Sequence, residues 1–417
     1  MSDLMNVDQA VEQVLQHFAR LPPEPVGLPD ALNRIAAADI IAPGNIPPFA
    51  NSSMDGFAVR AAATHGADNV PITLQVVMDI PAGSMPQGRL GAGEAARIMT
   101  GAPMPDGADA VVPVENTDAR WNAGSNASLP AAVQVRRSVK AGDYVRPAGE
   151  DIPAGAHVIP AGRIIRAAEI GILASLGMET VSVIRQPRVA ILSTGDELVD
   201  VGEALTPGKI RDSNGYVLAA LAETYGAIPL RIPIARDTLE DVRRRFREAL
   251  DSKPDLIISS AGVSVGAFDV VRAVMDELGK IDFWRINLRP GKPLAFGHLG
   301  GVPFFGLPGN PVSAMVTFDI FVRPALLRLR GGDERVPYVQ AIVGEDLHSD
   351  GRRTYLRVTL RHEHGVWVAT TTGNQSSGAL TSMMLADGLL IVPEDMGSIP
   401  AGTALPVRLL RDQSEYV

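Results

Sequence analysis

The residues of this chain that are best suited to chemistry form a Gly/Ser-rich loop in the segment PDLIISSAGVSVGAFD. The apolar run LIIS precedes the loop without an alternating polar face, which predicts a parallel strand covered on both sides. Gly262 and Gly266 allow backbone amides to approach an anion closely. Ser260 and Ser264 add hydroxyl donors. The loop is therefore predicted to bind a phosphate group.

A carboxylate, Asp269, opens the helix predicted after this loop. At that position it can cap the helix or hold a magnesium ion that bridges to phosphate oxygens. Taken alone, the loop is explained equally well as a plain Gly-rich connection that ends in a helix cap. The other polar clusters of the chain shift this balance toward a binding site.

Polar residues also follow the other predicted strands of the same region. STGDEL follows the apolar run VAIL, RDSN opens the next predicted helix, and an Arg-Asp pair follows IPIA. Each cluster alone could be a helix cap, but the carboxyl ends of strands in an open α/β sheet meet where such sheets bind ligands. The candidates placed there are Thr194, Gly195, Asp196, Glu197, Ser213, Asn214, Asp237 and Ser260.

Two cations mark a possible anion site further along the chain. Arg289 and Lys292 flank a Pro-Gly turn in NLRPGKP, and GLPGNPVSA predicts a helix that starts near Pro311, with Ser313 close behind. A helix start beside two cations suits an oxyanion. A solvated turn is the alternative interpretation for the two cations.

Several groups of predicted elements must position these residues. Apolar residues at helical spacing predict a helix over residues 7–18, and a second short helix is predicted over residues 31–39. Short β-prone pieces broken by Gly and Pro predict a β-rich insertion from about residue 43 to 155. Apolar strands alternate with helical patterns over residues 188–330, which predicts a doubly wound α/β domain. Short strands after residue 332 predict a small C-terminal β domain.

The composition describes an ordered globular protein and excludes several classes of function. The 417 residues are 46% hydrophobic and 20% charged, and their number suggests about three domains. A net charge of −9 argues against nucleic acid or an anionic membrane as the main partner. The absence of cysteine excludes disulfides, thiolate nucleophiles and Cys-ligated metals. Neither a signal peptide nor a membrane span is predicted, so a cytoplasmic location is expected.

Several motifs in a fixed order resemble the molybdopterin molybdenumtransferase family, whose members insert molybdenum into adenylylated molybdopterin. They are PPFANSSMDGFAVR, RIMTGAPMPDGADAVV, STGDEL, SAGVSVG, LRPGKP and GLPGNPVSA. The resemblance runs nearly end to end. It implies an α/β domain of the molybdopterin-binding type with a β-rich inserted domain, a small linking domain and a C-terminal β-barrel-like domain. The implied boundaries are 23–41 with 156–186 for the linking domain, 42–155 for the insertion, 3–22 with 187–335 for the α/β domain, and 336–417 for the last domain.

The resemblance also implies roles for individual residues. The catalytic positions that it implies are Asp55, Thr100, Asp151, Glu197, Asp237 and Asp269. Asp237 and Asp269 would bind magnesium against the pyrophosphate link, and Glu197 would orient the substrate or shuttle protons. A mixed cradle suits molybdate, a tetrahedral dianion, and its implied members are Arg289, Lys292, Ser313, Arg352 and either Ser377 or Ser382. The further substrate-binding residues are Gly262, Ser264, Gly266, Pro308, Gly309 and Asn310, beside those at the strand ends.

The family implies a homodimer whose site combines the α/β domain of one chain with other domains of its partner. Molybdopterin adenylyltransferase and molybdoenzyme maturation proteins are further expected partners. Two alternatives to the molybdenum transfer remain open. One is the preceding adenylyl transfer on the same loop, which the additional domains disfavour. The other is a non-catalytic scaffold, which the carboxylates at the strand ends disfavour because a scaffold has no need of them.

Overall fold

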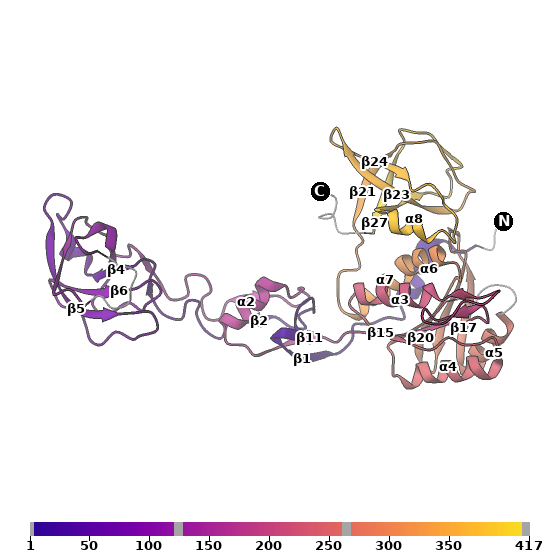
Figure 1. Cartoon of the computed structure of the whole chain (residues 1–417), viewed down its shortest axis with the longest axis horizontal. Coiled ribbons are helices and arrows are strands. Elements are labelled where there is room, and N and C mark those ends of the chain that lie inside the picture. Colours follow the sequence, from indigo (N-terminus) through magenta and orange to yellow (C-terminus); the bar gives the residue numbers. More distant parts are fainter. Residues whose placement is uncertain (1–3, 121–127, 261–267, 411–417) are drawn as a thin grey trace. The chain divides into compact units, whose positions relative to one another are not determined.

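The computed structural model describes residues 4–120, 128–260 and 268–410 (Figure 1). The chain divides into two compact units. The described residues of the first unit fall within Met1–Pro25, Asn33–Ile35 and Ser182–Val417, and those of the second within Val26–Leu32 and Ala36–Val181. The finer division into four domains stays a prediction.

A six-stranded sheet forms the centre of the first unit, in the strand order β15, β12, β16, β20, β19, β17. The first four strands are parallel, and β19 and β17 run antiparallel to their neighbours. The strands are β12 (Arg188–Ser193), β15 (Ile228–Arg231), β16 (Leu256–Ser260), β17 (Gly279–Arg285), β19 (Pro293–Leu299) and β20 (Val302–Leu307). Because β15, β12, β16 and β20 are parallel, their carboxyl ends lie along the same edge of the sheet.

Helices cover both faces of this sheet, as the alternation along β12 shows. Val189 and Ile191 belong to one buried cluster, whereas Ala190 and Leu192 belong to another. Figure 1 shows α3, α6 and α7 on one face and α4 and α5 on the other. The helices and helical turns are α1 (Val7–Leu15), α3 (Ser213–Thr224), α4 (Leu239–Asp251), α5 (Phe268–Leu278), α6 (Pro311–Thr317), η4 (Phe318–Val322, a π-helix) and α7 (Arg323–Leu329).

The starts of two of these helices follow from their capping residues. The Asn6 side chain accepts hydrogen bonds from the backbone N–H groups of Asp8 (2.8 Å) and Gln9 (3.3 Å), which begins α1. The Thr238 hydroxyl accepts from the backbone of Asp241 in the same way, at 3.3 Å, and begins α4. Capping therefore fixes where the chain turns from strand-end loop into helix.

The C-terminal strands close into a barrel in the order β23, β24, β21, β27, β25, because β25 also pairs with β23. The bounds are β21 (Tyr338–Val343), β22 (Leu347–His348), β23 (Arg353–Glu363), β24 (Val366–Thr371), α8 (Leu380–Leu385), β25 (Gly388–Val392), β26 (Ser398–Ile399) and β27 (Ala404–Leu409). A short strand of the α/β part, β18 (Leu288–Arg289), joins this sheet beside β23. The barrel is thus attached to the turn that carries Arg289.

A buried ion network strengthens this attachment. Asp319 of η4 accepts a hydrogen bond from Arg323 at 2.9 Å and another from Arg408 of β27. All three side chains are at least nine-tenths buried. Paired and hydrogen-bonded charges of this kind are costly to separate, so the barrel is held in a defined position on the α/β part.

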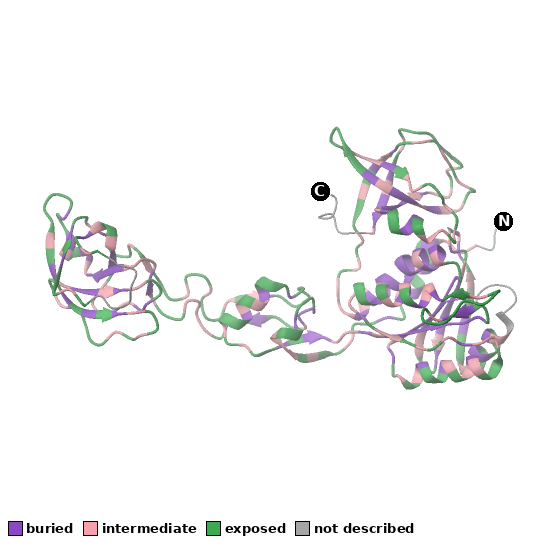
Figure 2. Ribbon diagram, viewed as in Figure 1, coloured by how far each residue is buried: buried purple, intermediate pink, exposed green. Residues whose placement is uncertain are grey.

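The second unit contains a five-stranded sheet in the order β7, β4, β6, β5, β8. Figure 2 shows that buried residues of this unit concentrate in the strands of its sheet. The elements with bounds inside this unit are η1 (Leu28–Asp30), β2 (Ile40–Ile41), β3 (Asn51–Ser52), β4 (Gly56–Val59), η2 (Ala61–Thr64), β5 (Ile72–Ile80), β6 (Glu94–Ile98), β7 (Ala110–Pro113), η3 (Val114–Asn116), β8 (Ala132–Val135), β9 (Val145–Arg146), β10 (His157–Ile159) and α2 (Ala167–Ser175). The chain passes between the units in β1 (Pro23–Gly27) and β11 (Thr180–Ile184). Two further short strands of the first unit, β13 (Leu198–Val199) and β14 (Ile210–Arg211), pair with each other.

The predicted fold class, α/β plus β, is confirmed. The short helix predicted over residues 31–39 is wrong, because Asn33 has a left-handed backbone (φ 62°) that interrupts a helix. Arg34 instead donates to the Ile184 carbonyl at 3.0 Å and pairs with Glu24. None of the helices in the described ranges combines the length and apolar character needed to cross a membrane.

Candidate active site: two adjoining pockets in the α/β and barrel parts

The carboxyl ends of β12, β16 and β20 open into a cavity of about 440 Å³, which we call the strand-end pocket. Its lining residues are Glu197, Leu198, Ile210, Arg211, Asp212, Ser213, Asn214, Ser260, Gly291, Pro293, Pro308, Gly309, Asn310, Pro311 and Ser313. Eight of the predicted site residues are among them. The sheet topology therefore brings together residues that are far apart in sequence, as predicted for a ligand-binding edge.

Glycine at position 195 is required by the local geometry of the turn after β12. Gly195 has φ +148°, and a Cβ there would lie 2.5 Å from Oε2 of Glu197. The turn therefore folds the Glu197 carboxylate against its own backbone. Thr194, one residue earlier, is buried, and its hydroxyl has no hydrogen-bond partner within residues 4–120, 128–260 and 268–410.

Asp196 and Asp237 lie together beside these strand ends. The backbone N–H of each donates to the carboxylate of the other, at 3.2 Å in both cases. The second oxygen of Asp237, Oδ1, is buried and has no hydrogen-bond partner among the described residues. Because a buried carboxylate oxygen normally has a partner, this atom is a candidate ligand for a cation.

The predicted phosphate loop and its carboxylate cannot be placed in the same way. Gly262, Ser264 and Gly266 lie outside the described residues, and so does the side chain of Asp269. Within the described residues there is no group of three or more His, Cys, Asp or Glu side chains that could hold a metal. The magnesium site predicted at Asp237 and Asp269 therefore stays a prediction.

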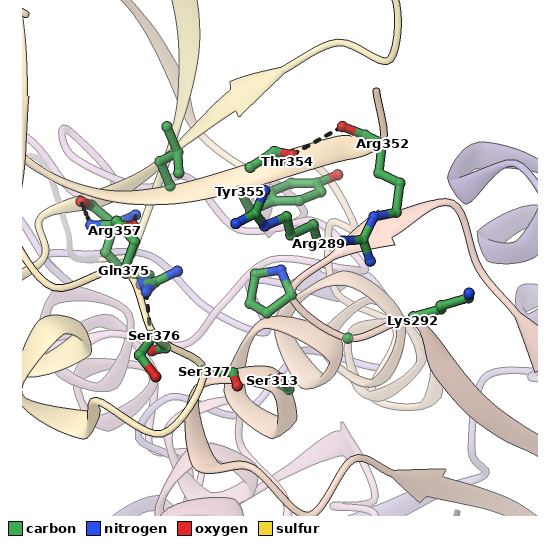
Figure 3. A pocket seen from close by; sticks show the side chains of 13 residues that line it. Arg289, Lys292, Ser313, Arg352, Thr354, Tyr355, Arg357, Gln375, Ser376 and Ser377 are labelled. Carbon is green, nitrogen blue, oxygen red and sulfur yellow. Dashed lines mark hydrogen bonds between the residues drawn. The ribbon is translucent and has the colours of Figure 1, made fainter. Parts of the chain in front are cut away.

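A second cavity, of about 430 Å³, lies between the α/β part and the barrel (Figure 3), and we call it the oxyanion pocket. Its lining residues are Arg289, Pro290, Gly291, Lys292, Ser313, Arg352, Thr354, Tyr355, Leu356, Arg357, Gln375, Ser376 and Ser377. Of the residues that the resemblance implies for the molybdate cradle, Arg289, Lys292, Ser313, Arg352 and Ser377 are among them, and Ser382 is not. Among the described residues that line this pocket, four side chains are cationic and none carries a carboxylate.

Contacts between the two parts of the chain position the residues of the oxyanion pocket. β18 pairs with β23 so that Arg289 lies opposite Thr354. The backbone N–H of Val312 donates to the Ser377 carbonyl at 3.0 Å, and the Asn310 side chain donates to the Ser377 hydroxyl at 3.1 Å. The pocket therefore has one wall from the α/β part and one from the barrel.

The most deeply buried cation of this pocket is Arg357, which the sequence reasoning did not name. Its side chain is 1% exposed. Its guanidinium donates to the Ser382 hydroxyl at 3.2 Å and to the Ser376 carbonyl at 3.3 Å. Burial, together with the charge of Arg289, lowers the pKa of Arg357 to about 10, so the group is still charged at neutral pH.

Arg357 has no carboxylate within ion-pair distance in the described part of the chain, and the same holds for Lys292. The charge of Arg357 is buried as well as unpaired, and such a charge is costly, which indicates that its side of the pocket is built for an anionic ligand. Lys292 is exposed. The sequence contained a signal for Arg357, since a charged residue in the middle of the apolar strand TYLRVTL needs a partner. Ser382 is one of the two serines considered for the molybdate cradle. It does not line the pocket, but its hydroxyl accepts a hydrogen bond from Arg357 and so orients that side chain.

The other two cations share a carboxylate at the edge of the pocket. Arg352 forms a forked interaction with Asp350, in which Nε lies 3.2 Å from each carboxylate oxygen. Nη1 of Arg289 lies 3.2 Å from Oδ2 of Asp350. Asp350 itself does not line the pocket.

The remaining predicted catalytic residues belong to the second unit. Thr100 donates to Oδ1 of Asp55 twice, from its backbone N–H at 2.7 Å and from its hydroxyl at 2.8 Å. The structure thus brings these two predicted residues together. Gly56 allows the turn after Asp55, because a Cβ there would lie 2.1 Å from the Val112 carbonyl oxygen. Asp151 is exposed, and its backbone N–H donates to the Ile46 carbonyl.

Comparison with known proteins assigns the family. Three family models match in order: the MoeA N-terminal region (domain I and II) over residues 5–177, a probable molybdopterin binding domain over 190–328, and the MoeA C-terminal region (domain IV) over 340–410. Two solved structures of a molybdopterin biosynthesis MoeA protein from Pyrococcus horikoshii are similar, with TM-scores of 0.83 and 0.78 and sequence identities of 33% and 27%. They cover 98% and 97% of this chain, and 100% of their own chains in both cases.

Curated relatives agree over nearly the whole length. The chain is 38% identical to molybdopterin molybdenumtransferase 2 of Mycobacterium tuberculosis (strain H37Rv), covering 97% of this chain and 99% of the relative. It is 34% identical to the molybdopterin molybdenumtransferase of Bacillus subtilis, covering 98% and 94%. With this identity over the full length, the chain belongs to the molybdopterin molybdenumtransferase family.

Proposed function

We propose that this chain transfers molybdenum from molybdate to adenylylated molybdopterin, releases AMP and so forms the molybdenum cofactor. The observation that carries the proposal is the oxyanion pocket, where Lys292 and Arg357 have no carboxylate partner among the described residues. Family membership over the full length supports the same reaction.

Molybdate is assigned to the oxyanion pocket because its charge and shape match the groups that line it. A tetrahedral dianion offers four acceptor oxygens, and the cavity lining includes the donors Lys292, Arg357 and Ser313. Charge-assisted hydrogen bonds from cations are stronger than neutral ones. This pocket is accordingly the molybdate side of the site.

The adenylylated pterin is assigned to the strand-end pocket. The two pockets share Gly291 and Ser313, so a ligand in one lies next to a ligand in the other. Asn214 and Asn310 supply side-chain amides, and Ser213 and Ser260 supply hydroxyls, for a large polar ligand. Holding both reactants in adjoining cavities favours the transfer by positioning and by charge stabilisation.

Magnesium is part of the proposal because the donor set at the strand ends suits it. Hard cations prefer carboxylate oxygens, and Oδ1 of Asp237 is a buried oxygen that lacks a hydrogen-bond partner in the described part of the chain. Asp237 and Asp269 would hold the ion. When bound, magnesium would neutralise charge on the phosphate groups. Glu197, close by, would orient the substrate or carry a proton.

Asp55, Thr100 and Asp151 complete the proposed catalytic set. Because they belong to the second unit, we propose a homodimer in which these residues act on the pockets of the partner chain. A monomeric mass in light scattering at micromolar concentration would contradict this arrangement. A cytoplasmic location and contacts with molybdopterin adenylyltransferase and molybdoenzyme maturation proteins belong to the same proposal.

The decisive experiment incubates the purified protein with adenylylated molybdopterin, magnesium and molybdate, and measures AMP release. Molybdate-dependent release is expected. Consumption of ATP with molybdopterin alone would instead favour the adenylyl transfer, and absence of both reactions would favour a scaffold. The full-length relatives named molybdenumtransferases argue against these two alternatives.

A further inference from the structure

Asp350 is the carboxylate closest to the cations of the oxyanion pocket. It lies in the loop between β22 and β23, and its side chain is 37% exposed. It contacts Arg352 of its own loop and, at 3.2 Å, Arg289 of the α/β part. The hydrogen bond from Arg352, together with the charges of Arg352 and Arg289, lowers the pKa of Asp350 below its ordinary value. The group is therefore ionised at neutral pH.

This carboxylate divides the cations of the pocket into two kinds. Arg289 and Arg352 share Asp350, whereas Lys292 and Arg357 have no carboxylate partner among the described residues. An anion that enters the pocket meets two uncompensated charges and two that are partly compensated. The charge available to the ligand thus depends on one side chain that does not line the cavity.

The interaction with Arg352 alone would not distinguish Asp350 from other surface aspartates. Asp333 makes the same forked contact with Arg335, also two residues later, and both of these side chains are exposed. The difference is a second arginine partner, because Asp350 also reaches Arg289 across the junction of the barrel and the α/β part. A role in folding of the loop would explain the forked interaction of Asp350 with Arg352, but it would not explain the contact of Asp350 with Arg289.

We propose that Asp350 is an internal counter-anion that weakens oxyanion binding and reduces the preference of the pocket for dianions over monoanions. This inference rests on the proposed function of the pocket. The repulsion between a fixed negative charge and a ligand is proportional to the ligand charge, so Asp350 acts about twice as strongly on a dianion.

The test compares the wild-type protein with Asp350→Asn, which keeps the shape of the side chain and removes its charge. Dissociation constants are measured by calorimetry at fixed ionic strength for molybdate, for sulfate as a tetrahedral dianion and for perchlorate as a tetrahedral monoanion. The variant is expected to bind the two dianions about tenfold more tightly and perchlorate about threefold more tightly. Asp350→Glu should return toward the wild-type values.

Asp333→Asn is the matched control, since it removes the same charge from the same kind of Asp-Arg fork outside the pocket. Its affinities should equal those of the wild type. Unchanged or weaker dianion binding in Asp350→Asn would overturn the proposal and leave Asp350 as a group that only positions the arginines. An equal gain for the dianions and for perchlorate would overturn the charge-selectivity part. If the wild-type protein does not bind molybdate, both this inference and the proposed function are overturned. If the wild-type protein binds molybdate but Asp350→Asn does not bind it more tightly, only this inference is overturned.

Discussion

The strand-end pocket and the oxyanion pocket adjoin each other but differ in charge. The charged residues lining the strand-end pocket are of both signs, namely Glu197, Arg211 and Asp212, whereas those lining the oxyanion pocket are all cations. The two cavities share the wall formed by Gly291 and Ser313. The α/β part supplies all the lining residues of the first pocket, and the barrel supplies eight of the thirteen lining residues of the second. Under the proposed function, this difference would let one site hold two anionic reactants, the pterin with a metal ion and molybdate with cationic side chains.

The largest effect is expected from Asp237→Asn on the strand-end side. The amide can still accept the hydrogen bond from the Asp196 backbone but no longer balances a magnesium ion. AMP release should fall by roughly 100-fold, because lost charge stabilisation at a reacting group is of that order. Molybdate binding should be unaffected. Asp251→Asn, at the exposed end of α4, is the control, and wild-type turnover in Asp237→Asn would remove the proposed metal role.

The next largest effect is expected from Arg357→Ala on the oxyanion side. A charge-assisted hydrogen bond is worth roughly 1.5–3 kcal/mol, so calorimetry should show molybdate binding weakened by about tenfold to a hundredfold. Arg361→Ala removes an exposed arginine from the same strand and should leave the affinity unchanged. If both variants bind molybdate like the wild type, the buried arginine serves packing rather than the ligand.

The smallest effect is expected from Ser377→Ala, which removes a neutral donor from the oxyanion pocket. The backbone carbonyl of Ser377 would still accept the hydrogen bond from Val312. A neutral hydrogen bond contributes roughly 0.5–1.5 kcal/mol, so molybdate affinity should fall by about threefold. A loss as large as that of Arg357→Ala would show that Asn310, which donates to this hydroxyl, has also moved.

The sequence predicted the strands that lead into the strand-end pocket but did not predict Arg357 of the oxyanion pocket, and the physical reason lies in the range of the contacts. The apolar runs VAILS and LIIS identify their strands locally, and parallel strands place their ends at one edge. The position of Arg357 instead depends on β23 pairing with β18, which lies more than sixty residues earlier in the chain. Such long-range pairing leaves no periodic signal. The antiparallel strands β17 and β19, which flank the Arg289 turn, were not predicted either.

The helix predicted over residues 31–39 failed for a related reason. Helical spacing of apolar residues describes a local preference, which tertiary contacts can override. Here the Arg34 side chain reaches the Ile184 carbonyl from 150 residues away, and Asn33 adopts the left-handed conformation that directs the chain there. Neither feature could be inferred from the segment alone.

The most direct test of the two-sided site is the titration of Lys292→Ala with molybdate and, separately, with adenylylated molybdopterin. Lys292 lines only the oxyanion pocket. Calorimetry should show molybdate affinity lowered by about tenfold, as expected for one lost charge-assisted contact, and pterin affinity changed by less than about twofold. Lys280→Ala, an exposed lysine of β17, controls for the loss of charge. Equal weakening of both ligands by Lys292→Ala would mean one shared anion site and would contradict the account.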